Sequence, residues 1–323
     1  MREYSLCDWK GEFMMHLLAK QLNSTIKTAI VRVAMAGVLL ASFSLMTPNI
    51  ANAYSAPSTA GNSFYVTSAW LNVQSNGHTF AYNEGASGEP NASVVAILDF
   101  GRQESTSSGW QVLLTDGTEE TQSWVQTVAE DFASGWQSDH STTLTEAIGT
   151  NNSDYAWSNG SSLWATAGTD WANLVDAVAN QSYQYIAVYG ANDIESWAGS
   201  FSNGWVATGT DSTDWCQAYN NVSGSQTTID YGSEAYVEDP SVWTQQQVYD
   251  CAYGYLDDIV LPEIYYSGEA TDWQGLYNDY SSLFFNGITS ENGAGGTLSW
   301  QSGWADLNNA TGGSDVYSWA TNI

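Results

Sequence analysis

The clearest structural signal in the sequence is the run Val94-Val95-Ala96-Ile97-Leu98-Asp99-Phe100-Gly101. Its residues are apolar without interruption until a carboxylate and, two positions later, a glycine end it. A strand that is buried on both faces has this composition, and such strands belong to parallel sheets. The run therefore predicts a central parallel strand with Asp99 near its carboxyl end.

Further strand-like and helix-like segments alternate along the chain after this run. Strand patterns cover 143–149, 185–195, 227–231, 258–265 and 296–300, and helical spacing of apolar residues covers 121–136, 163–180, 240–256 and 270–282. Such alternation indicates right-handed βαβ units and a parallel sheet. Six strands are visible in this way.

We expect an α/β fold, a (β/α)8 TIM-like barrel of complete or irregular form. A closed barrel needs eight strands, and the segments 64–73 and 283–289 supply the two that are missing. An open doubly wound sheet is the alternative. Against it, no Gly-x-Gly-x-x-Gly turn and no phosphate loop follows any of the expected strands.

The start of the chain has the three parts of a secretory signal peptide. Five of the six cationic residues come first, followed by an apolar segment from Val33 to Met46 and the small-x-small site Ala51-Asn52-Ala53. The apolar segment is short for a membrane span, although an uncleaved anchor is the alternative. We expect 1–53 to be a leader cut after Ala53, 54–63 a linker and 64–323 a single barrel domain of a secreted protein.

The charge of the chain excludes several classes of function. It carries 35 Asp and Glu against six Lys and Arg, a formal net charge of −29, and Arg102 is the only cation after the leader. Nucleic acid is not an expected partner, because phosphate backbones are bound by clustered Lys and Arg. Without Lys after the leader, Schiff-base chemistry and Lys-assisted phosphoryl transfer are excluded there.

The lack of bases also bears on the medium that the protein meets. At low pH carboxylates are neutral while Lys and Arg stay charged, so removing bases keeps the net charge near zero and limits self-repulsion. We infer export into an acidic environment. A secreted protein that is merely acidic is the alternative.

Cysteine and histidine content predicts a disulfide and no metal centre. Cys7 lies in the leader, which leaves Cys216 and Cys251 as a pair in an oxidising compartment. Two buried thiols are the alternative. The two histidines after the leader, His78 and His140, have no metal-ligand spacing, so we expect neither a zinc site nor an organic cofactor.

Carboxylates gather at the predicted carboxyl ends of the strands, which meet at one face of a barrel. Asp99 follows the first strand, Asp193 and Glu195 the third, and Glu263 the fifth. Glycoside hydrolysis needs two carboxyl groups, one as acid and one as base or nucleophile, and like charges keep one of them protonated. These four residues are our catalytic candidates, although each also has a structural interpretation as a helix cap or loop anchor.

Aromatic residues near the same strand ends suit a sugar, whose apolar faces stack on rings. The predicted substrate-binding residues are Trp197, Tyr231, Tyr265 and Trp300, with Tyr266 and Trp304 as further candidates at the rim.

Four motifs carry a resemblance to known proteins. They are Ile97-Leu98-Asp99-Phe100-Gly101, Ala147-Ile148-Gly149-Thr150-Asn151-Asn152, Asn192-Asp193-Ile194-Glu195 and Leu261-Pro262-Glu263-Ile264-Tyr265. Together they resemble a group of uncharacterised secreted bacterial proteins with a glycoside-hydrolase-like TIM barrel. More distantly, an acidic residue on strand one plus a later Asp-x-Glu is similar to the lysozyme-type barrels of glycoside hydrolase family 25.

The second resemblance implies that Glu195 is the acid, with Asp99 and Asp193 beside it. We therefore expect a secreted glycoside hydrolase that acts on a polysaccharide such as cell-wall glycan. A non-catalytic extracellular glycan-binding or cell-surface barrel is the alternative, because one fold carries many functions.

Overall fold

The computed structural model of the chain describes residues 55–89, 92–106, 109–154, 161–196, 200–201, 204–222, 224–232, 240–255, 258–291, 296–313 and 316–323. The chain divides into two compact units, Met1–Asn52 and Ala53–Ile323, and the described residues all belong to the second. The predicted leader and Trp197 lie outside the described residues.

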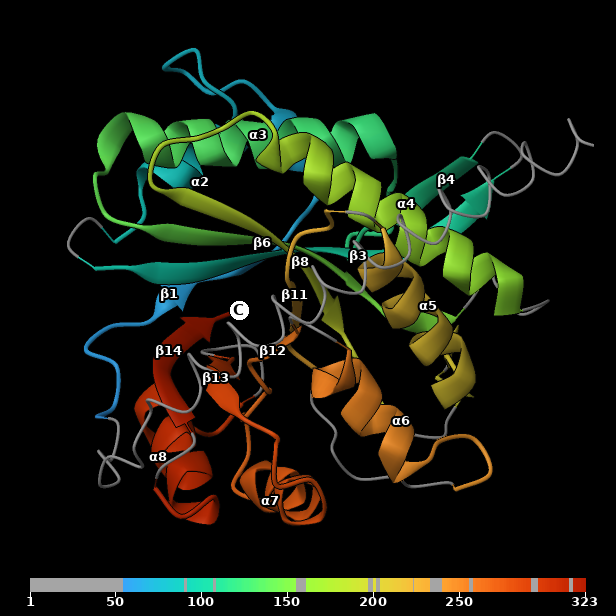
Figure 1. Cartoon of the computed structure of the whole chain (residues 1–323). Coiled ribbons are helices and arrows are strands. Elements are labelled where there is room, and N and C mark those ends of the chain that lie inside the picture. Colours follow the sequence, from blue (N-terminus) through green and yellow to red (C-terminus); the bar gives the residue numbers. More distant parts are fainter. Residues whose placement is uncertain are drawn as a thin grey trace, which may run out of the picture. The chain divides into compact units, whose positions relative to one another are not determined.

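Strands and helices alternate through the second unit (Figure 1). The strands are β1 (Gly61–Asn62), β2 (Phe64–Tyr65), β3 (Val94–Thr106), β4 (Gly109–Leu113), β5 (Glu119–Thr121), β6 (Leu144–Asn151), β7 (Ser153–Asp154), β8 (Ile186–Asp193), β9 (Ser200–Phe201), β10 (Gly204–Val206), β11 (Thr228–Asp230), β12 (Asp258–Val260), β13 (Phe285–Ser290) and β14 (Val316–Asn322). The helices are α2 (Phe80–Ala86), α3 (Gln122–Asp139), α4 (Ser161–Ala179), α5 (Gly209–Asn221), α6 (Gln245–Tyr249), α7 (Glu269–Asp279) and α8 (Trp300–Ala310), with a 3-10 turn η1 (Ser68–Leu71) and a π turn η2 (Asp250–Gly254).

Side-chain caps begin many of these helices. Thr79, Thr121, Thr208, Thr244 and Ser299 each accept a hydrogen bond from the backbone N–H three residues further on. A hydroxyl at this position satisfies one of the N–H groups that a helix start leaves without a partner. The polar Thr and Ser residues of the loops therefore fix where the helices start.

The largest sheet is parallel in its central part, as the apolar run at 94–101 predicts. Its order is β12-β11-β8-β6-β3-β4-β5, with β2 also paired to β3. The pairs β12–β11, β11–β8, β8–β6, β6–β3 and β3–β2 are parallel, whereas β4 and β5 continue from the end of β3 as an antiparallel hairpin. The parallel sheet of an α/β fold is thus confirmed.

A second sheet contacts both ends of the parallel set. Its order is β1-β14-β13, again parallel. At one end the short segment 61–65 pairs with β14 through β1 and with β3 through β2. At the other end Glu263, just beyond β12, forms a parallel bridge to Thr289 of β13. A third, small sheet has the order β7-β10-β9.

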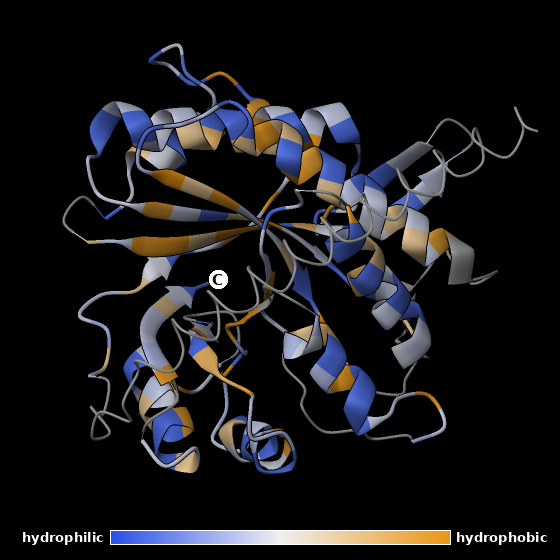
Figure 2. Cartoon of the chain, in the orientation of Figure 1, coloured by the Kyte–Doolittle hydropathy of each residue, from blue (hydrophilic) through white to orange (hydrophobic). Residues whose placement is uncertain are grey.

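Two separate apolar cores follow from the alternation of side chains along the strands. Val94, Ala96, Leu98 and Phe100 of β3 belong to the larger core, which includes the buried faces of the helices. The residues between them point the other way, and a smaller core contains residues of the strands and of the positions directly after β11 and β12: Val95, Ile97, Ala147, Ala191, Ile229, Tyr231 and Leu261. Figure 2 shows this apolar character along β3, β6 and β8. These strands are apolar on both faces because one face packs in the larger core and the other in the smaller core.

Most of the predicted elements are present, but some strands and the disulfide were predicted wrongly. Residues 296–300 are no strand, since Trp300 begins α8 after an irregular segment, and the expected strand 64–73 is extended in β2 only at Phe64–Tyr65. The local patterns also missed β4, β5 and β14, which is the pairing partner of β13. Cys216 and Cys251 are two buried thiols in the larger core that no disulfide joins.

No helix within the described ranges has both the length and the apolar character that crossing a membrane requires.

Candidate functional site

The inner face of the parallel strands carries acidic residues where the strands end. Ile97, Ala191 and Leu261 belong to the smaller core. Two positions after them come Asp99 and Asp193, which point to the same side of β3 and β8 by the period of two, and Glu263, which lies just beyond β12 and bridges to Thr289. The register of the strands therefore brings these residues together at one end of the sheet, as predicted.

Three of the four catalytic candidates form one carboxylate cluster. Asp193, Glu195 and Glu263 each have a carboxylate oxygen within 4.8 Å of those of the other two. We call these three residues the carboxylate cluster. Asp99 lies close enough to raise the pKa of both Asp193 and Glu263, so it belongs to the same acidic site.

Glu263 is buried and held by a neighbouring phenol. Only 5% of its surface is exposed, and its Oε1 accepts a hydrogen bond of 2.6 Å from the hydroxyl of Tyr265. Burial raises the pKa of Glu263 well above its usual range, with the Tyr265 hydrogen bond opposing the shift and Glu195 adding to it. Tyr265, predicted as a sugar-binding residue, is buried and acts on Glu263 instead.

Asp193 and Glu195 occupy neighbouring positions with different environments. The Oδ1 of Asp193 is buried and accepts no hydrogen bond within the described part of the chain. Burial raises the pKa of Asp193 well above its usual range, and the charges of Glu195 and Glu263 raise it further. Glu195 is partly exposed, and its backbone N–H donates to Oδ1 of Asn152 at 3.1 Å while Asn152 Nδ2 donates to its carbonyl. Asn152 thus fixes the backbone that presents Glu195.

Asp99 sits at an irregularity of β3. Gly101 has a φ of +71°, which a residue with a side chain rarely adopts, and its N–H donates to Asp99 Oδ1 at 2.6 Å. Burial raises the pKa of Asp99 to about 6, against the lowering effect of the hydrogen bond from Gly101 and of the nearby Tyr231 hydroxyl. Tyr231 is itself buried and donates to the carbonyl of Thr150 at 3.1 Å. The ring of Tyr231, predicted as a substrate-binding residue, packs in the smaller core.

Tyr65 is a site residue that the sequence analysis did not single out. It pairs in register with Asp99 across β2 and β3, and 41% of its surface is exposed. Burial of its hydroxyl and the nearby charges of Glu263, Asp99 and Asp193 raise its pKa. The alternation within the expected strand 64–73 could have identified it, since Tyr65 is the aromatic residue that the register places beside the strand-end acids.

The other predicted rim aromatics have mixed positions. Trp300, at the first turn of α8, packs partly buried against the larger core, and Trp304 is buried with its Nε1 donating to the carbonyl of Tyr317. Both lie on α8 and not at a strand end. Tyr266 is 45% exposed. Glu269 accepts hydrogen bonds from the backbone N–H groups of Tyr265 and Tyr266 and so anchors this loop.

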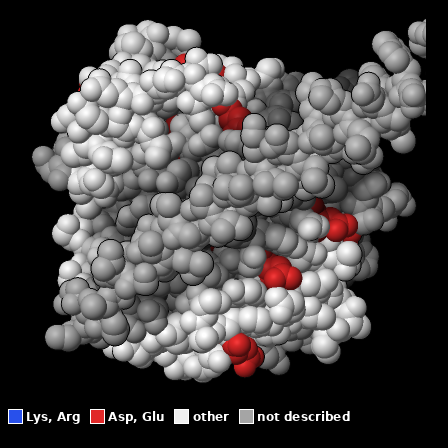
Figure 3. Space-filling view, viewed as in Figure 1, with Lys and Arg blue, Asp and Glu red and all other residues white. Residues whose placement is uncertain are grey.

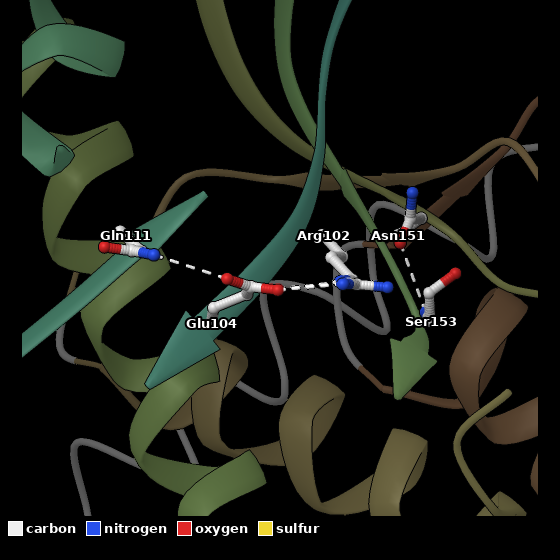
Figure 4. A network of polar contacts seen from close by, with 5 residues as sticks. All are labelled: Arg102, Glu104, Gln111, Asn151 and Ser153. Carbon is white, nitrogen blue, oxygen red and sulfur yellow. Dashed lines mark hydrogen bonds and ion pairs between the residues drawn. The ribbon is translucent and has the colours of Figure 1, made fainter. Parts of the chain in front are cut away.

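The single cation after the leader is already engaged. Arg102 donates from Nε and Nη2 to Oε1 of Glu104, at 3.1 and 2.9 Å, and Gln111 donates to the other oxygen of Glu104 (Figure 4). On the face shown in Figure 3 the described residues expose Asp and Glu but no Lys or Arg. The only Lys or Arg after the leader is therefore already paired with Glu104.

The chemistry available at the site is that of carboxyl and phenol groups. Three carboxylate oxygens this close together are also a suitable partial ligand set for one oxygen-preferring divalent cation such as Ca²⁺. The described residues of the cluster offer neither His nor Cys, so the donor set does not suit zinc.

Comparisons with known proteins leave the family open. No protein-family model matches the chain, and no curated protein matches it either. Among solved structures, a homocysteine methyltransferase from Escherichia coli has a TM-score of 0.40 at 6% identity, over 75% of this chain and 77% of that one. A putative lyase/mutase from Burkholderia cenocepacia has a TM-score of 0.40 at 10% identity, over 84% and 77%. A calcium-dependent phosphoinositol-specific phospholipase C from Pseudomonas sp has a TM-score of 0.35 at 10% identity, over 84% and 91%. Likenesses this weak carry no argument about the reaction.

Proposed function

We propose that this chain is an exported glycoside hydrolase that works on a polysaccharide by a retaining two-carboxylate mechanism. The single observation that carries the proposal is the approach of Glu195 and Glu263 to within 4.8 Å through one oxygen each. Retaining enzymes hold their two carboxyl groups about 5–5.5 Å apart, whereas inverting enzymes leave about 6.5–9.5 Å for a water molecule.

The environments of the two residues suggest their roles. Glu263 accepts a hydrogen bond from Tyr265, which opposes the rise that burial gives its pKa and supports the ionised form that a nucleophile needs. Glu195 is the more exposed of the two, where a leaving-group oxygen can reach it. Glu263 attacks the anomeric carbon as the glycosidic C–O bond breaks, and Glu195 gives its proton to the leaving oxygen. Water then gives a proton to Glu195, displaces Glu263 and releases the sugar.

We further propose that the strands close into an eight-stranded parallel barrel. The segment 61–65 pairs on both sides, with β14 and with β3, and Glu263 pairs with Thr289. The cycle 61–65, β3, β6, β8, β11, β12, β13, β14 then has no free edge. Such a barrel places its active site at the carboxyl ends of the strands, which is where the carboxylate cluster lies.

Hydrolysis of a panel of glycans, with peptidoglycan included, tests the proposal at pH 3 and pH 6. Changing Glu195→Gln and Glu263→Gln, one at a time, is expected to lower kcat by at least about 100-fold, the usual scale for loss of an acid or nucleophile. Glu89→Gln is the matched control, because Glu89 is exposed in the loop before β3. The anomeric configuration of the first product, followed by NMR, should match that of the substrate.

Two results would overturn parts of this proposal. Full activity in both Gln variants excludes the two-carboxylate mechanism, and inversion excludes the nucleophile role of Glu263. Glycan binding without turnover in wild type supports the alternative of a glycan-binding protein. Assays with EDTA and with added Ca²⁺ show whether a cation takes part.

A further inference from the structure

The mechanism leaves one carboxyl group of the cluster without a task. Glu195 and Glu263 serve as acid and nucleophile, whereas Asp193 lies within 4.8 Å of both. Its Oδ1 is buried and has no hydrogen-bond partner among the described residues. A buried acceptor left unsatisfied costs roughly 1–3 kcal/mol, so a ligand that donates to it gains that amount. Asp193 is therefore open to a donor on a bound ligand.

The position of Asp193 indicates which part of a sugar carries this donor. Glu263 and Glu195 must face the anomeric carbon and the leaving oxygen. Asp193, within 4.8 Å of both, is then the group available to the substituent on the ring carbon next to the anomeric carbon. In sugars of different classes this substituent is a hydroxyl, an acylated amine or a free amine.

Charge distinguishes between these substituents. The site contains the carboxylate cluster and Asp99, while Arg102, the sole cation after the leader, is ion-paired with Glu104 at 2.9 Å. A substrate that bears carboxylates or phosphates would find no counter-charge there. An ammonium group has three N–H donors and a positive charge, so it satisfies Asp193, favours the ionised form that burial disfavours and offsets the repulsion among the neighbouring carboxylates.

We propose that Asp193 is the specificity-determining residue of the site and binds the free amine of a 2-amino sugar, so that the substrate is a cationic, glucosamine-type glycan. This assignment rests on the proposed glycoside hydrolase function. It names the substrate class that the proposed function leaves open.

The experiment compares three tetrasaccharides of matched linkage: glucosamine, N-acetylglucosamine and glucose. Both kcat/KM for hydrolysis and the affinity for the Glu195→Gln variant by calorimetry are measured at pH 6. Wild type is expected to favour the glucosamine oligomer about 10- to 100-fold in kcat/KM, the usual range for a charge-assisted hydrogen bond. High salt is expected to reduce this preference.

Two variants locate the effect. Asp193→Asn is expected to lower the ratio of kcat/KM for glucosamine to that for glucose by about 10-fold or more. Asp139→Asn, the same charge change at the exposed end of α3, is expected to leave the ratio as it is. Circular dichroism confirms that each variant is folded, and the comparison of substrates with wild type needs no variant.

The outcomes separate this inference from the proposed function. Hydrolysis of neutral or acetylated oligomers at an equal or higher kcat/KM overturns the amine site and leaves the glycosidase standing. Tight binding of the glucosamine oligomer without turnover of any glycan supports the amine site and overturns the glycosidase. No preference in either binding or turnover overturns the assignment of Asp193.

Discussion

Raising the pH should destabilise this protein, in contrast to the common pattern in which acid unfolds a protein. The main groups responsible are Asp99 and Asp230, which are 1% and 4% exposed. Asp230 Oδ1 accepts a hydrogen bond of 3.0 Å from the N–H of Gly232. Burial nevertheless raises the pKa of Asp230 to about 7 and that of Asp99 to about 6, from 3.8 in each case.

The direction of the effect follows from which state binds more protons. Well below pH 3.8 both carboxyl groups are protonated whether the chain is folded or unfolded, and the full stability is present. As the pH rises, the unfolded chain releases these protons near pH 4, while the folded protein keeps them until about pH 6 and 7. Stability therefore falls with rising pH across this window.

The magnitude is large on the scale of protein stability. One pKa unit corresponds to about 1.4 kcal/mol, so Asp99 contributes a loss of about 3 kcal/mol and Asp230 one of about 4 kcal/mol. Whole domains are stable by about 5–15 kcal/mol. Asp193 and Glu263 have pKa values raised in the same direction, so the loss involves the proposed active site as well.

Urea denaturation followed by tryptophan fluorescence at pH 3.5, 5.5 and 8 measures the effect. We expect the free energy of unfolding to be highest at pH 3.5 and to fall by several kcal/mol by pH 8. Asp230→Asn keeps the acceptor for Gly232 and should flatten the pH dependence, whereas the exposed Asp139→Asn should not. A free energy at pH 8 equal to or above that at pH 3.5 would refute the reasoning and the inference of an acidic environment.

Three further predictions concern packing and covalent state. Glu146 is fully buried, and both of its carboxyl oxygens lack a hydrogen-bond partner among the described residues. Glu146→Gln should therefore raise the free energy of unfolding at pH 8 by about 1–3 kcal/mol. A lower free energy of unfolding at pH 8, measured by urea denaturation, would contradict this. A Cβ at Gly149 would lie 2.9 Å from the hydroxyl of Tyr231. Gly149→Ala should therefore lower the free energy of unfolding by about 1–3 kcal/mol in the same assay. An unchanged urea midpoint would count against the packing described. Because Cys216 and Cys251 are thiols, a reductant should leave the melting temperature unchanged, and a marked drop would show that a disulfide forms.

Much of the fold could be predicted from local patterns. The apolar runs at 94–101 and 143–149 became β3 and β6, and the helical spacing at 121–136 and 163–180 became α3 and α4. Such patterns are reliable because a strand buried on two faces, or a helix buried along one stripe, needs apolar residues at fixed short spacings in the sequence. The segment 296–300 was predicted as a strand because its short apolar pattern fits either state, and the cap at Ser299 made it a helix start instead.

The candidate site was predicted in part for the same reason. Acidic residues at strand ends, two positions beyond apolar ones, were visible in the sequence at Asp99, Asp193 and Glu263. Tyr231 and Tyr265 were also found, but as sugar-binding residues, because the sequence does not show whether a ring faces solvent or a neighbouring carboxyl group. In the structure both phenols are buried and donate hydrogen bonds.

The sequence by itself determined the α/β alternation, the parallel strands, the position of the acids at the strand ends and the near absence of positive charge. These are properties of composition and of residues close together in the chain. Only the tertiary structure decided which strands are neighbours, that Glu195 and Glu263 approach within 4.8 Å, and that Tyr65 joins them. Such contacts link segments up to about 200 residues apart, and their energies come from burial and register that no local pattern records.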